Sequence, residues 1–248
     1  MITVDVVVPV YNEEQALPRS IPLLREFLSG PRFPYDWSII IGDNASIDNT
    51  PTVGRKLEEE SDGRVEYVRI ERKGRGFALK QIWGKSTASV VSYMDVDLST
   101  GLDAFPPLIR AIAEEGYDVA IGSRLAPQAR VKRSLRRRVL TRGYNAIIKA
   151  MFFTRFSDAQ CGFKAVSRAA ADRILPLCQD NNWFFDTELL ILAEKMGYRV
   201  KDVPVEWVED KDTRVKIAGT VTEDLRGLMR LRLTQPWRRA GKQRQAAS

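Results

Sequence analysis

Histidine is absent from this chain of 248 residues, and its absence narrows the available chemistry. Without imidazole there can be no Ser-His-Asp triad, no histidine general base and no histidine metal ligand. Any catalysis must therefore rest on carboxylates, arginines, lysines, a metal ion or groups of the substrate itself.

Cysteine and long apolar runs are also scarce. The only cysteines are Cys161 and Cys178, too few for a disulfide framework, so we expect reduced thiols in a cytoplasmic protein. No run of about 18 uncharged apolar residues occurs, which argues against a transmembrane helix. The N-terminus, MITVDVVVPVYNEE, has no basic leader before its apolar run and indicates a first strand, not a secretory signal.

Basic residues are abundant but unevenly placed. The formal net charge is +7. Seven basic residues and no acid fall within 130–142, and seven more basic residues and no acid follow Asp224. Without these two clusters the chain holds 25 basic against 32 acidic residues. Clusters of this kind contact phosphates of nucleic acid or of anionic lipids, or form a solvated face.

Apolar runs with strand character alternate with amphipathic helical segments over the first half of the chain. Val4–Val10, for example, is almost continuously β-branched, as in a strand buried on both faces, and Glu13–Leu28 follows with helical spacing. Such β-α-β alternation predicts an α/β fold with a doubly wound, mostly parallel sheet flanked by helices. Ligands of such sheets bind beyond the carboxyl ends of the strands.

Two aspartates end the strand predicted at Val90–Met94, in the motif MDVDLST. If the strand continued through the motif, alternation would put Asp95 and Asp97 on the same side, about 7 Å apart. Carboxylates that close repel each other unless a cation lies between them. Mg²⁺ and Mn²⁺ are commonly held by one or two carboxylates plus phosphate oxygens. The motif therefore suggests a metal–diphosphate site, with a solvated acidic turn as the alternative.

Five motifs resemble family-2 glycosyltransferases of the GT-A fold in order and spacing. They are VVVPVYNEE, IIIGDNASIDNT, KGRGFALK, MDVDLST and DAQCGFKA. The chain is most similar to the polyprenyl-phosphate subgroup, which includes dolichyl-phosphate mannose synthases and prenyl-phosphate glucosyltransferases. The resemblance covers roughly residues 4–210 and implies a single GT-A domain.

The resemblance also implies a role for individual residues. A nucleotide-sugar site would be lined by residues at or after the ends of the first three strands: Pro9, Tyr11, Glu13, Asp43, Asn44, Arg75 and Gly76. Asp97 would bind a divalent cation, Mg²⁺ or Mn²⁺, with Asp95 near the sugar or metal and Ser99 where relatives supply a glutamine. Arg124 would face the diphosphate or acceptor phosphate, and Asp158 would lie beside the sugar.

An acceptor phosphate would be held by Arg137 and Thr141, which match an Arg-x-x-x-Ser pattern of relatives. We expect a GT-A domain over 1–219, with a nucleotide-binding half at 1–101 and an acceptor half at 102–219. Residues 220–248 are expected to form a basic helix and a disordered tail. The loop at 208–216 departs from the pattern of the family, which leaves its phosphate contact in doubt.

The expected reaction is inverting transfer of a hexose from a nucleotide-diphosphate sugar, GDP-mannose or UDP-glucose, to a polyprenyl phosphate. Arg133–Phe153 predicts a basic amphipathic helix on an anionic membrane surface, with the apolar stripe of Thr220–Arg232 and Trp237 as further contacts. The protein would be cytoplasmic and peripherally bound, with a separate membrane anchor or flippase as a possible partner. No nucleic acid partner is expected.

Three other readings stay open. The first is a family-2 glycosyltransferase that acts on a soluble sugar or glycan. The second is a non-catalytic relative that binds nucleotide sugars. The third is a nucleic-acid-binding protein that uses the arginine clusters, although the interleaved aromatic and basic residues typical of single-strand binding are sparse.

Overall fold

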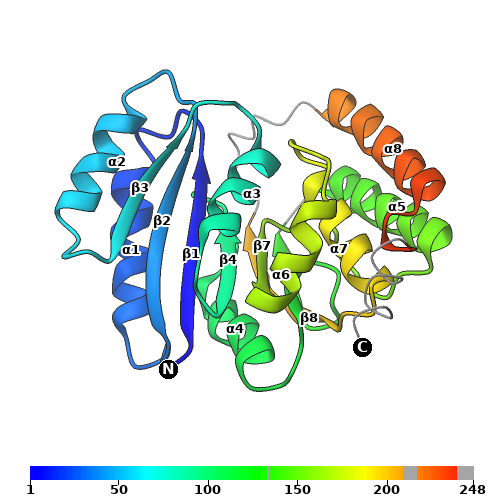
Figure 1. Cartoon of the computed structure of the whole chain (residues 1–248), viewed down its shortest axis with the longest axis horizontal. Coiled ribbons are helices and arrows are strands. Elements are labelled where there is room, and N and C mark those ends of the chain that lie inside the picture. The colour runs from blue at the N-terminus through cyan, green and yellow to red at the C-terminus, as the bar shows by residue number, and fades with distance from the viewer. Residues whose placement is uncertain (133, 209–216, 239–248) are drawn as a thin grey trace.

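The computed structural model describes residues 1–132, 134–208 and 217–238, with side chains for all of these except 217–220. Its centre is a seven-stranded sheet in the order β3-β2-β1-β4-β7-β5-β8 (Figure 1). Neighbouring strands are parallel except β7, which is antiparallel to β4 and β5. The strands are β1 (Thr3–Val10), β2 (Asp36–Asn44), β3 (Val65–Ile70), β4 (Val90–Met94), β5 (Val119–Ser123), β7 (Phe163–Ser167) and β8 (Val200–Pro204).

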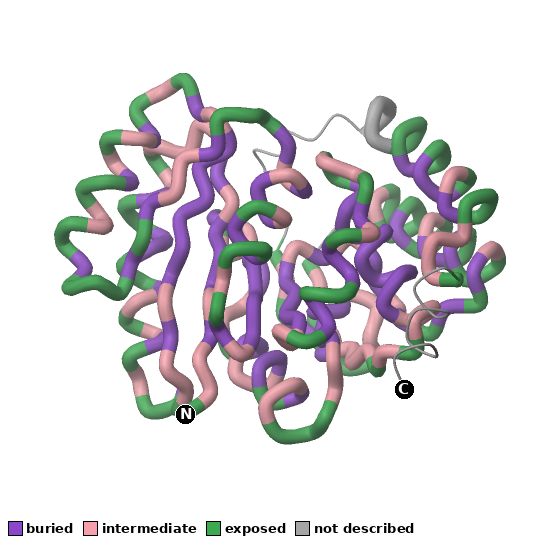
Figure 2. The backbone as a smooth tube through the Cα atoms, viewed as in Figure 1, coloured by how far each residue is buried: buried purple, intermediate pink, exposed green. Residues whose placement is uncertain are grey.

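Both faces of the sheet are buried beneath helices, which explains the continuous apolar character of its strands. In β1, Val7 packs with α3, α6 and α7, whereas Val6 and Val8 pack with α1 and α4 on the other face. The strands accordingly form the buried centre of the molecule (Figure 2). The helices are α1 (Leu17–Ser29), α2 (Thr50–Glu59), α3 (Arg75–Lys85), α4 (Phe105–Ala113), α5 (Leu135–Phe152), α6 (Arg168–Ile174), α7 (Phe185–Lys195) and α8 (Ile217–Thr234), with short 3-10 turns η1 (Leu102–Ala104) and η2 (Leu175–Leu177).

The predicted α/β fold is confirmed, with two local differences. The strand β7 was not predicted, because a lysine interrupts its apolar run, and the helix α6 that follows it was not predicted either. The sequence predicts one strand over Tyr198–Trp207, whereas the structure has two, β8 and β9 (Glu206–Val208). Pro204 has no N–H to continue the ladder, and after it β9 pairs with β6 (Arg130–Lys132) in a small second sheet.

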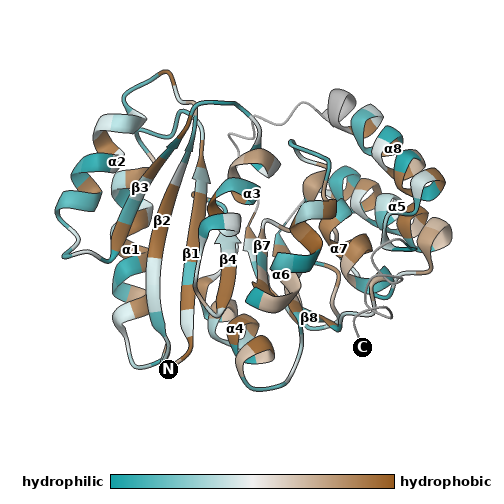
Figure 3. Cartoon of the chain, in the orientation of Figure 1, coloured by the Kyte–Doolittle hydropathy of each residue, from teal (hydrophilic) through white to brown (hydrophobic). Residues whose placement is uncertain are grey.

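Helices α5 and α8 lie side by side at the end of the molecule remote from β3 (Figure 1). Ile148 and Phe152 of α5 and Leu228 and Leu231 of α8 are buried in the core that also contains α7. Along both helices, hydrophobic and hydrophilic residues alternate (Figure 3). The C-terminal helix begins at Ile217, before the predicted start at 220, and the predicted disordered tail beyond 238 lies outside the described residues, as does most of the loop at 208–216.

Over the ranges that the structure covers, none of the helices combines the length and apolarity that crossing a bilayer requires.

Candidate active site

The two acidic residues of the MDVDLST motif lie in a tight turn at the carboxyl end of β4. The strand ends at Met94, and the N–H of Leu98 donates to the carbonyl of Asp95 (3.2 Å), with Leu98 at φ 49°. The expected strand alternation therefore does not apply, because both aspartates follow the strand. Asp97 is exposed, and its Oδ1 accepts a hydrogen bond from the N–H of Ser99 (2.9 Å). The turn thus presents a carboxylate and the Ser99 hydroxyl close together in sequence.

Asp95 is held from two sides. Its Oδ1 accepts a hydrogen bond from Nη2 of Arg75 (2.7 Å), and its N–H donates to the carbonyl of Gly162 (3.2 Å). A Cβ at Gly162 would come within 1.9 Å of Oδ2 of Asp95, so only glycine leaves room for this carboxylate. Burial raises the pKa of Asp95, as does nearby Asp97, while Arg75 opposes the rise. A cation bound between the two carboxylates would relieve their repulsion.

Arg75 begins α3 and is enclosed by aromatic rings. Its guanidinium carbon lies 5.1 Å from the ring centre of Tyr93 and 4.7 Å from that of Trp183. Burial alone would lower the pKa of Arg75, but Asp95 and other neighbouring acidic groups raise it, so the side chain stays charged. Gly76, the next residue, is buried, and a Cβ there would lie 2.5 Å from the Cβ of Phe185. Gly76 thus lies where α3 and α7 pack closely against each other.

The loop after β1 lines an open cleft of about 500 Å³ that includes Tyr11 and Glu13. The loop is tied to the segment after β2, because the N–H of Asn12 donates to Oγ of Ser46 (2.9 Å) and the N–H of Glu13 donates to Oγ1 of Thr50 (2.8 Å). Nζ of Lys73 lies 3.7 Å from the ring centre of Tyr11. This cleft is where the structure places the predicted base and ribose contacts of the first loop.

Asp43 and Asn44 at the end of β2 are buried and bonded to the protein. Oδ1 of Asp43 accepts from the N–H of Ser46 (2.9 Å), and its Oδ2 accepts from the hydroxyl of Tyr67 and from Nη1 of Arg69 (3.1 Å). Oδ1 of Asn44 accepts from the N–H of Gly74 (2.7 Å). These bonds shape the loops around the cleft, and direct contact of Asp43 or Asn44 with a nucleotide stays a prediction.

Arg124 and Asp158 form a two-point ion pair. Nε of Arg124 donates to Oδ2 of Asp158 (2.7 Å) and Nη2 donates to Oδ1 (2.9 Å), with the Arg124 N–H as a third donor (3.1 Å). The side chain of Arg124 is 9% exposed and that of Asp158 is completely buried. Burial opposes the charge of both groups, but their attraction prevails, so the pKa of Arg124 is raised and that of Asp158 is lowered. Asp95 also contributes to the raised pKa of Arg124.

The predicted acceptor residues lie on α5. Arg137 is half-buried, and Thr141 is buried on the face of α5 that packs inward. One turn further along, Oδ1 of Asn145 accepts from the N–H of Ala159 (2.9 Å), next to Asp158. The helix expected to hold the acceptor is therefore bonded to the loop that holds Arg124.

The residues of the acidic turn fit a divalent cation that binds together with a diphosphate. Among the residues with described side chains, no group of three or more His, Cys, Asp or Glu forms a closed metal site. Mg²⁺ keeps few protein ligands and completes its shell with phosphate oxygens and water. Asp97 and Asp95, with Ser99 beside them, offer a donor set of that kind, and the space left by Gly162 lets Asp95 take part.

Two features near the site were not predicted. Lys164 is completely buried beside Tyr93, and Trp183 covers Arg75. For Lys164, the available signal was a lysine inside an otherwise apolar run.

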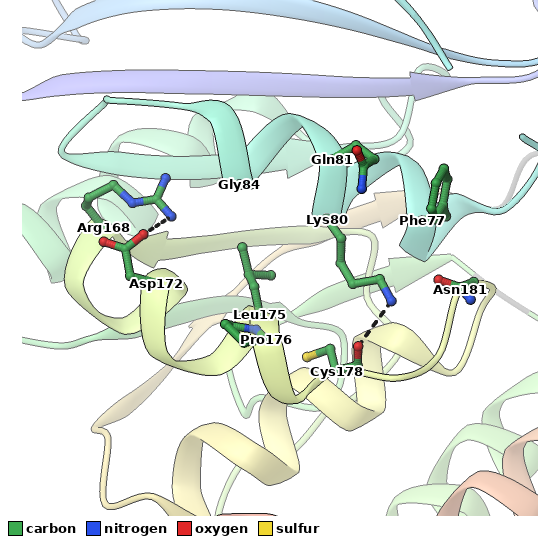
Figure 4. Close-up of a pocket in the computed structure, with 10 residues that line it drawn as sticks. All are labelled: Phe77, Lys80, Gln81, Gly84, Arg168, Asp172, Leu175, Pro176, Cys178 and Asn181. Atoms are coloured by element: carbon green, nitrogen blue, oxygen red, sulfur yellow. Dashed lines mark hydrogen bonds and ion pairs between the residues drawn. The ribbon is translucent and has the colours of Figure 1, made fainter. Parts of the chain in front are cut away.

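A second cleft of about 490 Å³ lies between α3 and the segment 168–181, where Nζ of Lys80 donates to the carbonyl of Cys178 (3.1 Å) (Figure 4). None of the predicted site residues lines it.

The sequence matches the family described as Glycosyl transferase family 2 over residues 5–175. It is 33% identical over 221 residues to Glycosyltransferase AglD of Haloferax volcanii, covering 89% of this chain and 35% of AglD. It is 30% identical over 237 residues to the dolichyl-phosphate beta-glucosyltransferase of Saccharomyces cerevisiae, covering 88% of this chain and 70% of that protein. The chain thus spans about a third of the length of AglD.

Solved structures share the fold. A mannosyltransferase from Pyrobaculum calidifontis, PcManGT, in complex with GDP-Man and Mn²⁺ superposes with a TM-score of 0.59 at 21% identity, covering 89% of this chain and 60% of that one. The glucosyl-3-phosphoglycerate synthase of Mycobacterium tuberculosis in complex with Mn²⁺ and UDP-glucose gives 0.64 at 18% identity, covering 93% and 78%. The resemblance inferred from the motifs is confirmed: the chain belongs to glycosyl transferase family 2, has the GT-A fold and is a glycosyltransferase.

Proposed function

We propose that this glycosyltransferase moves a hexose from a nucleotide-diphosphate sugar to the phosphate of a polyprenyl lipid, with a divalent cation, at an anionic membrane surface. The observation that carries the proposal is the acidic turn at Asp95 and Asp97, where Arg75 is bonded to Asp95 and the loop that holds Arg124 through Asp158 packs against the Asp95 carboxylate at Gly162. Curated relatives named dolichyl-phosphate beta-glucosyltransferases support the lipid acceptor.

In this proposal the chain's residues arrange charge around the donor. Asp97 and Asp95 would hold Mg²⁺ or Mn²⁺, which when bound would neutralise the diphosphate leaving group. Arg124, kept in orientation by Asp158, would add positive charge near the same oxygens. An acceptor phosphate is ionised at neutral pH, so no general base is needed, in keeping with a chain that lacks histidine. Direct displacement would invert the anomeric carbon.

The two halves of the domain would divide the substrates. Residues 1–101 supply the cleft at Tyr11 and Glu13 and the acidic turn, which we assign to the donor. Residues 102–219 supply Arg124 and α5, with Arg137 and Thr141, which we assign to the acceptor phosphate. The donor is proposed as UDP-glucose or GDP-mannose, since structural neighbours were solved with each.

The membrane contact would be the outer face of α5 and α8, on which unusually many apolar side chains are exposed. On α8 these recur every four residues and so form one stripe, and on α5 they lie on the side opposite its buried face. The exposed residues are Val221, Leu225, Met229 and Leu233 of α8, and Leu135, Val139, Leu140 and Ile147 of α5. Exposed apolar surface on this scale marks an interaction site.

Basic residues border this two-helix face. Arg136, Arg138, Arg142 and Lys149 of α5 and Arg226 and Arg232 of α8 are exposed. An apolar face with a basic border is the pattern of helices that lie in a membrane interface. Each basic residue near an anionic bilayer contributes about 1 kcal/mol of attraction. Charge complementarity therefore favours an anionic lipid surface as the occupant.

The structure corrects part of the predicted membrane stripe. Leu228 and Leu231 are buried in the core, because that side of α8 packs on α5 and α7. Trp237 packs against Phe152, with ring centres 6.2 Å apart. In their place Met229 and Leu233 complete the exposed stripe with Val221 and Leu225.

We propose a separate membrane anchor or flippase as a further partner. Co-purification from membranes would test it.

The deciding experiment follows the radiolabelled sugar. Purified protein is incubated with labelled UDP-glucose or GDP-mannose, Mn²⁺ and a short polyprenyl phosphate in anionic vesicles, and label is counted in the organic extract. The proposal expects label in the lipid extract with one of the two donors, and only when the metal is present. Label that enters only water-soluble sugars or glycans would show the soluble-acceptor alternative to be correct.

A further inference from the structure

A completely buried lysine lies beneath the acidic turn. Nζ of Lys164, the second residue of β7, contacts Oδ1 of Asp186 (3.0 Å), the hydroxyl of Tyr93 (3.2 Å) and the carbonyl of Cys161 (2.6 Å). An ammonium has three N–H donors, so these three oxygens satisfy Lys164 completely. The lysine is thus a built part of the core, not a side chain that extends to solvent.

Stability alone does not explain the buried ion pair of Lys164 and Asp186. Removing an ammonium and a carboxylate from water is costly, and apolar replacements are often at least as stable. Position is the role that the contacts suggest. Asp186 stands in the first turn of α7, and Lys164 is paired across the sheet with Tyr93 of β4, one residue before Met94 and two before Asp95.

Asp186 and Asp95 face the same arginine. The guanidinium of Arg75 is bonded to Asp95 and lies over the ring of Tyr93, whose hydroxyl donates to Asp186. Asp186 is thus linked to Arg75 through Tyr93, and after Asp95 and Tyr93 it also helps to raise the pKa of Arg75. Since Lys164 already neutralises Asp186, Arg75 remains with Asp95. Without the ammonium of Lys164, the buried carboxylate of Asp186 would lack a counter-charge. It would then compete with the more exposed Asp95 for the guanidinium of Arg75.

Lys164 also holds the other side of the turn. The carbonyl that it binds belongs to Cys161, between Asp158 and Gly162. Gly162 lies against the carboxylate of Asp95 and accepts from its N–H, and Asp158 holds Arg124. One buried ammonium therefore contacts both the loop that shapes the pocket of Asp95 and the carboxylate that would draw Arg75 away.

We propose that Lys164 is a positioning residue: by neutralising Asp186 it keeps Arg75 on Asp95, and so keeps Asp95 oriented toward the cation and diphosphate of the donor. This inference rests on the proposed function for what Asp95 binds. The contact of Arg75 with Asp95, however, can be examined in the protein without metal or nucleotide. Partners that orient a metal ligand change metal affinity by roughly 10–100-fold when they are removed.

Two variants separate the charge of Lys164 from its shape. Lys164→Met removes the ammonium and leaves Asp186 uncompensated, so Arg75 should turn from Asp95 to Asp186 in a metal-free crystal structure. Calorimetric titration with Mn²⁺ and UDP or GDP should then show affinity reduced about 10-fold. Adding Asp186→Asn removes the competing charge. The double variant should return Arg75 to Asp95 and restore affinity to within about 2-fold of the unmodified protein.

Lys80→Met is the matched control. Lys80 also donates to a backbone carbonyl, that of Cys178 (3.1 Å), but it lies in the second cleft, away from Asp95 (Figure 4). Its loss should leave Mn²⁺–nucleotide affinity unchanged. If Lys164→Met does not fold, the double variant decides: a folded double variant with normal affinity supports the inference, because it shows that neutralising Asp186 is what matters.

Different results would overturn the two proposals. If the unmodified protein binds neither nucleotide with Mn²⁺, the proposed function fails. If it binds, but Arg75 stays on Asp95 in Lys164→Met, or Asp186→Asn does not restore the affinity, the inference about Lys164 fails and the function stands.

Discussion

The guanidinium of Arg124 is locked by Asp158, 34 residues further along the chain, through two parallel hydrogen bonds of 2.7 and 2.9 Å. The resemblance to known transferases implied separate roles for the two residues, one at phosphate and one beside the sugar. In the structure the acid is completely buried under the arginine. Orientation of Arg124 is therefore the contribution of Asp158 that the geometry supports.

Asp158→Asn should lower both stability and turnover. The substitution leaves the nearly buried Arg124 without a counter-charge, and breaking a buried pair in this way costs about 3–5 kcal/mol. We expect urea unfolding to show a loss of this size in the free energy of unfolding. In steady-state assays, kcat should fall by a larger factor than the change in KM for the donor. Asp36→Asn is the control, because Asp36 forms a half-exposed pair with Arg64 (2.7 Å) and should change stability by less than about 1 kcal/mol. Equal effects of the two variants would contradict the role assigned to the buried pair.

Asp97→Asn should abolish most activity and leave the fold intact. Asp97 is exposed, and its only bond shown within the turn is from the N–H of Ser99, so its charge contributes little to folding. Loss of a metal ligand removes several kcal/mol of transition-state stabilisation, and we expect turnover to fall at least about 100-fold in steady-state assays. Asp103→Asn, at an exposed pair with Arg32, should retain full activity. Near-normal turnover of Asp97→Asn at saturating Mn²⁺ would remove Asp97 from the reaction.

Sequence alone predicted the parts of the fold that local pattern determines. The sequence predicts strands at Val65–Ile70 and Val90–Met94, and both are confirmed at both ends, because each is rich in β-branched and aromatic residues and has polar neighbours. The helix predicted from Glu13 begins only at Leu17. Asn12 adopts φ 56° and bonds to Ser46, a contact 34 residues away in sequence that no local pattern encodes.

Sequence reasoning named candidate site residues but not their arrangement, and their contacts with substrate stay predictions. The acidic turn, Arg75 and Arg124 lie at the carboxyl ends of the strands, as expected for a sheet of this kind. Their partners could not be inferred, because Asp158, Asp186 and Lys164 reach the site through tertiary packing. The buried lysine also concealed β7, since a charge in an apolar run normally indicates exposure.

Asp224→Asn should stabilise the protein at neutral and alkaline pH. Asp224 on α8 is buried and bonded to Nε2 of Gln160 (2.8 Å), and burial raises its pKa to about 7. Because the folded-state pKa lies above the ordinary aspartate value of 3.8, ionisation opposes folding, and stability is lost as pH rises from about 4 to about 7. Thermal melts should therefore show little difference between the variant and the parent at pH 4.5, and a Tm advantage for the variant that levels off above pH 7.

The exposed neighbour Glu223 supplies the control for this titration. Glu223→Gln should change the Tm by little at either pH, because substitution of an exposed side chain usually changes stability by about 0.5 kcal/mol or less. A Tm difference for Asp224→Asn that is the same at pH 4.5 and pH 8 would mean that packing, not ionisation, is responsible.

Met229→Glu should weaken membrane binding without unfolding the protein. Met229 is 55% exposed in the apolar stripe of α8, so a glutamate there remains solvated in the free protein but must enter the interface of the bilayer when the enzyme binds. It also adds negative charge against anionic lipid, which opposes the attraction of the basic border. We expect vesicle cosedimentation at low salt to fall about 10-fold, with Tm unchanged.

Leu23→Glu tests whether that loss belongs to the two-helix face. Leu23 has the same exposed fraction, 55%, but lies on α1, which covers the sheet on the face opposite α7. If α5 and α8 form the docking surface, the Leu23 variant binds phosphatidylglycerol vesicles as the parent does, and both are released at high salt as screening weakens the lipid–arginine attraction. If the two variants lose binding equally, or if the parent binds neutral vesicles just as well, basic residues beside an apolar stripe are not what attaches this enzyme to the membrane.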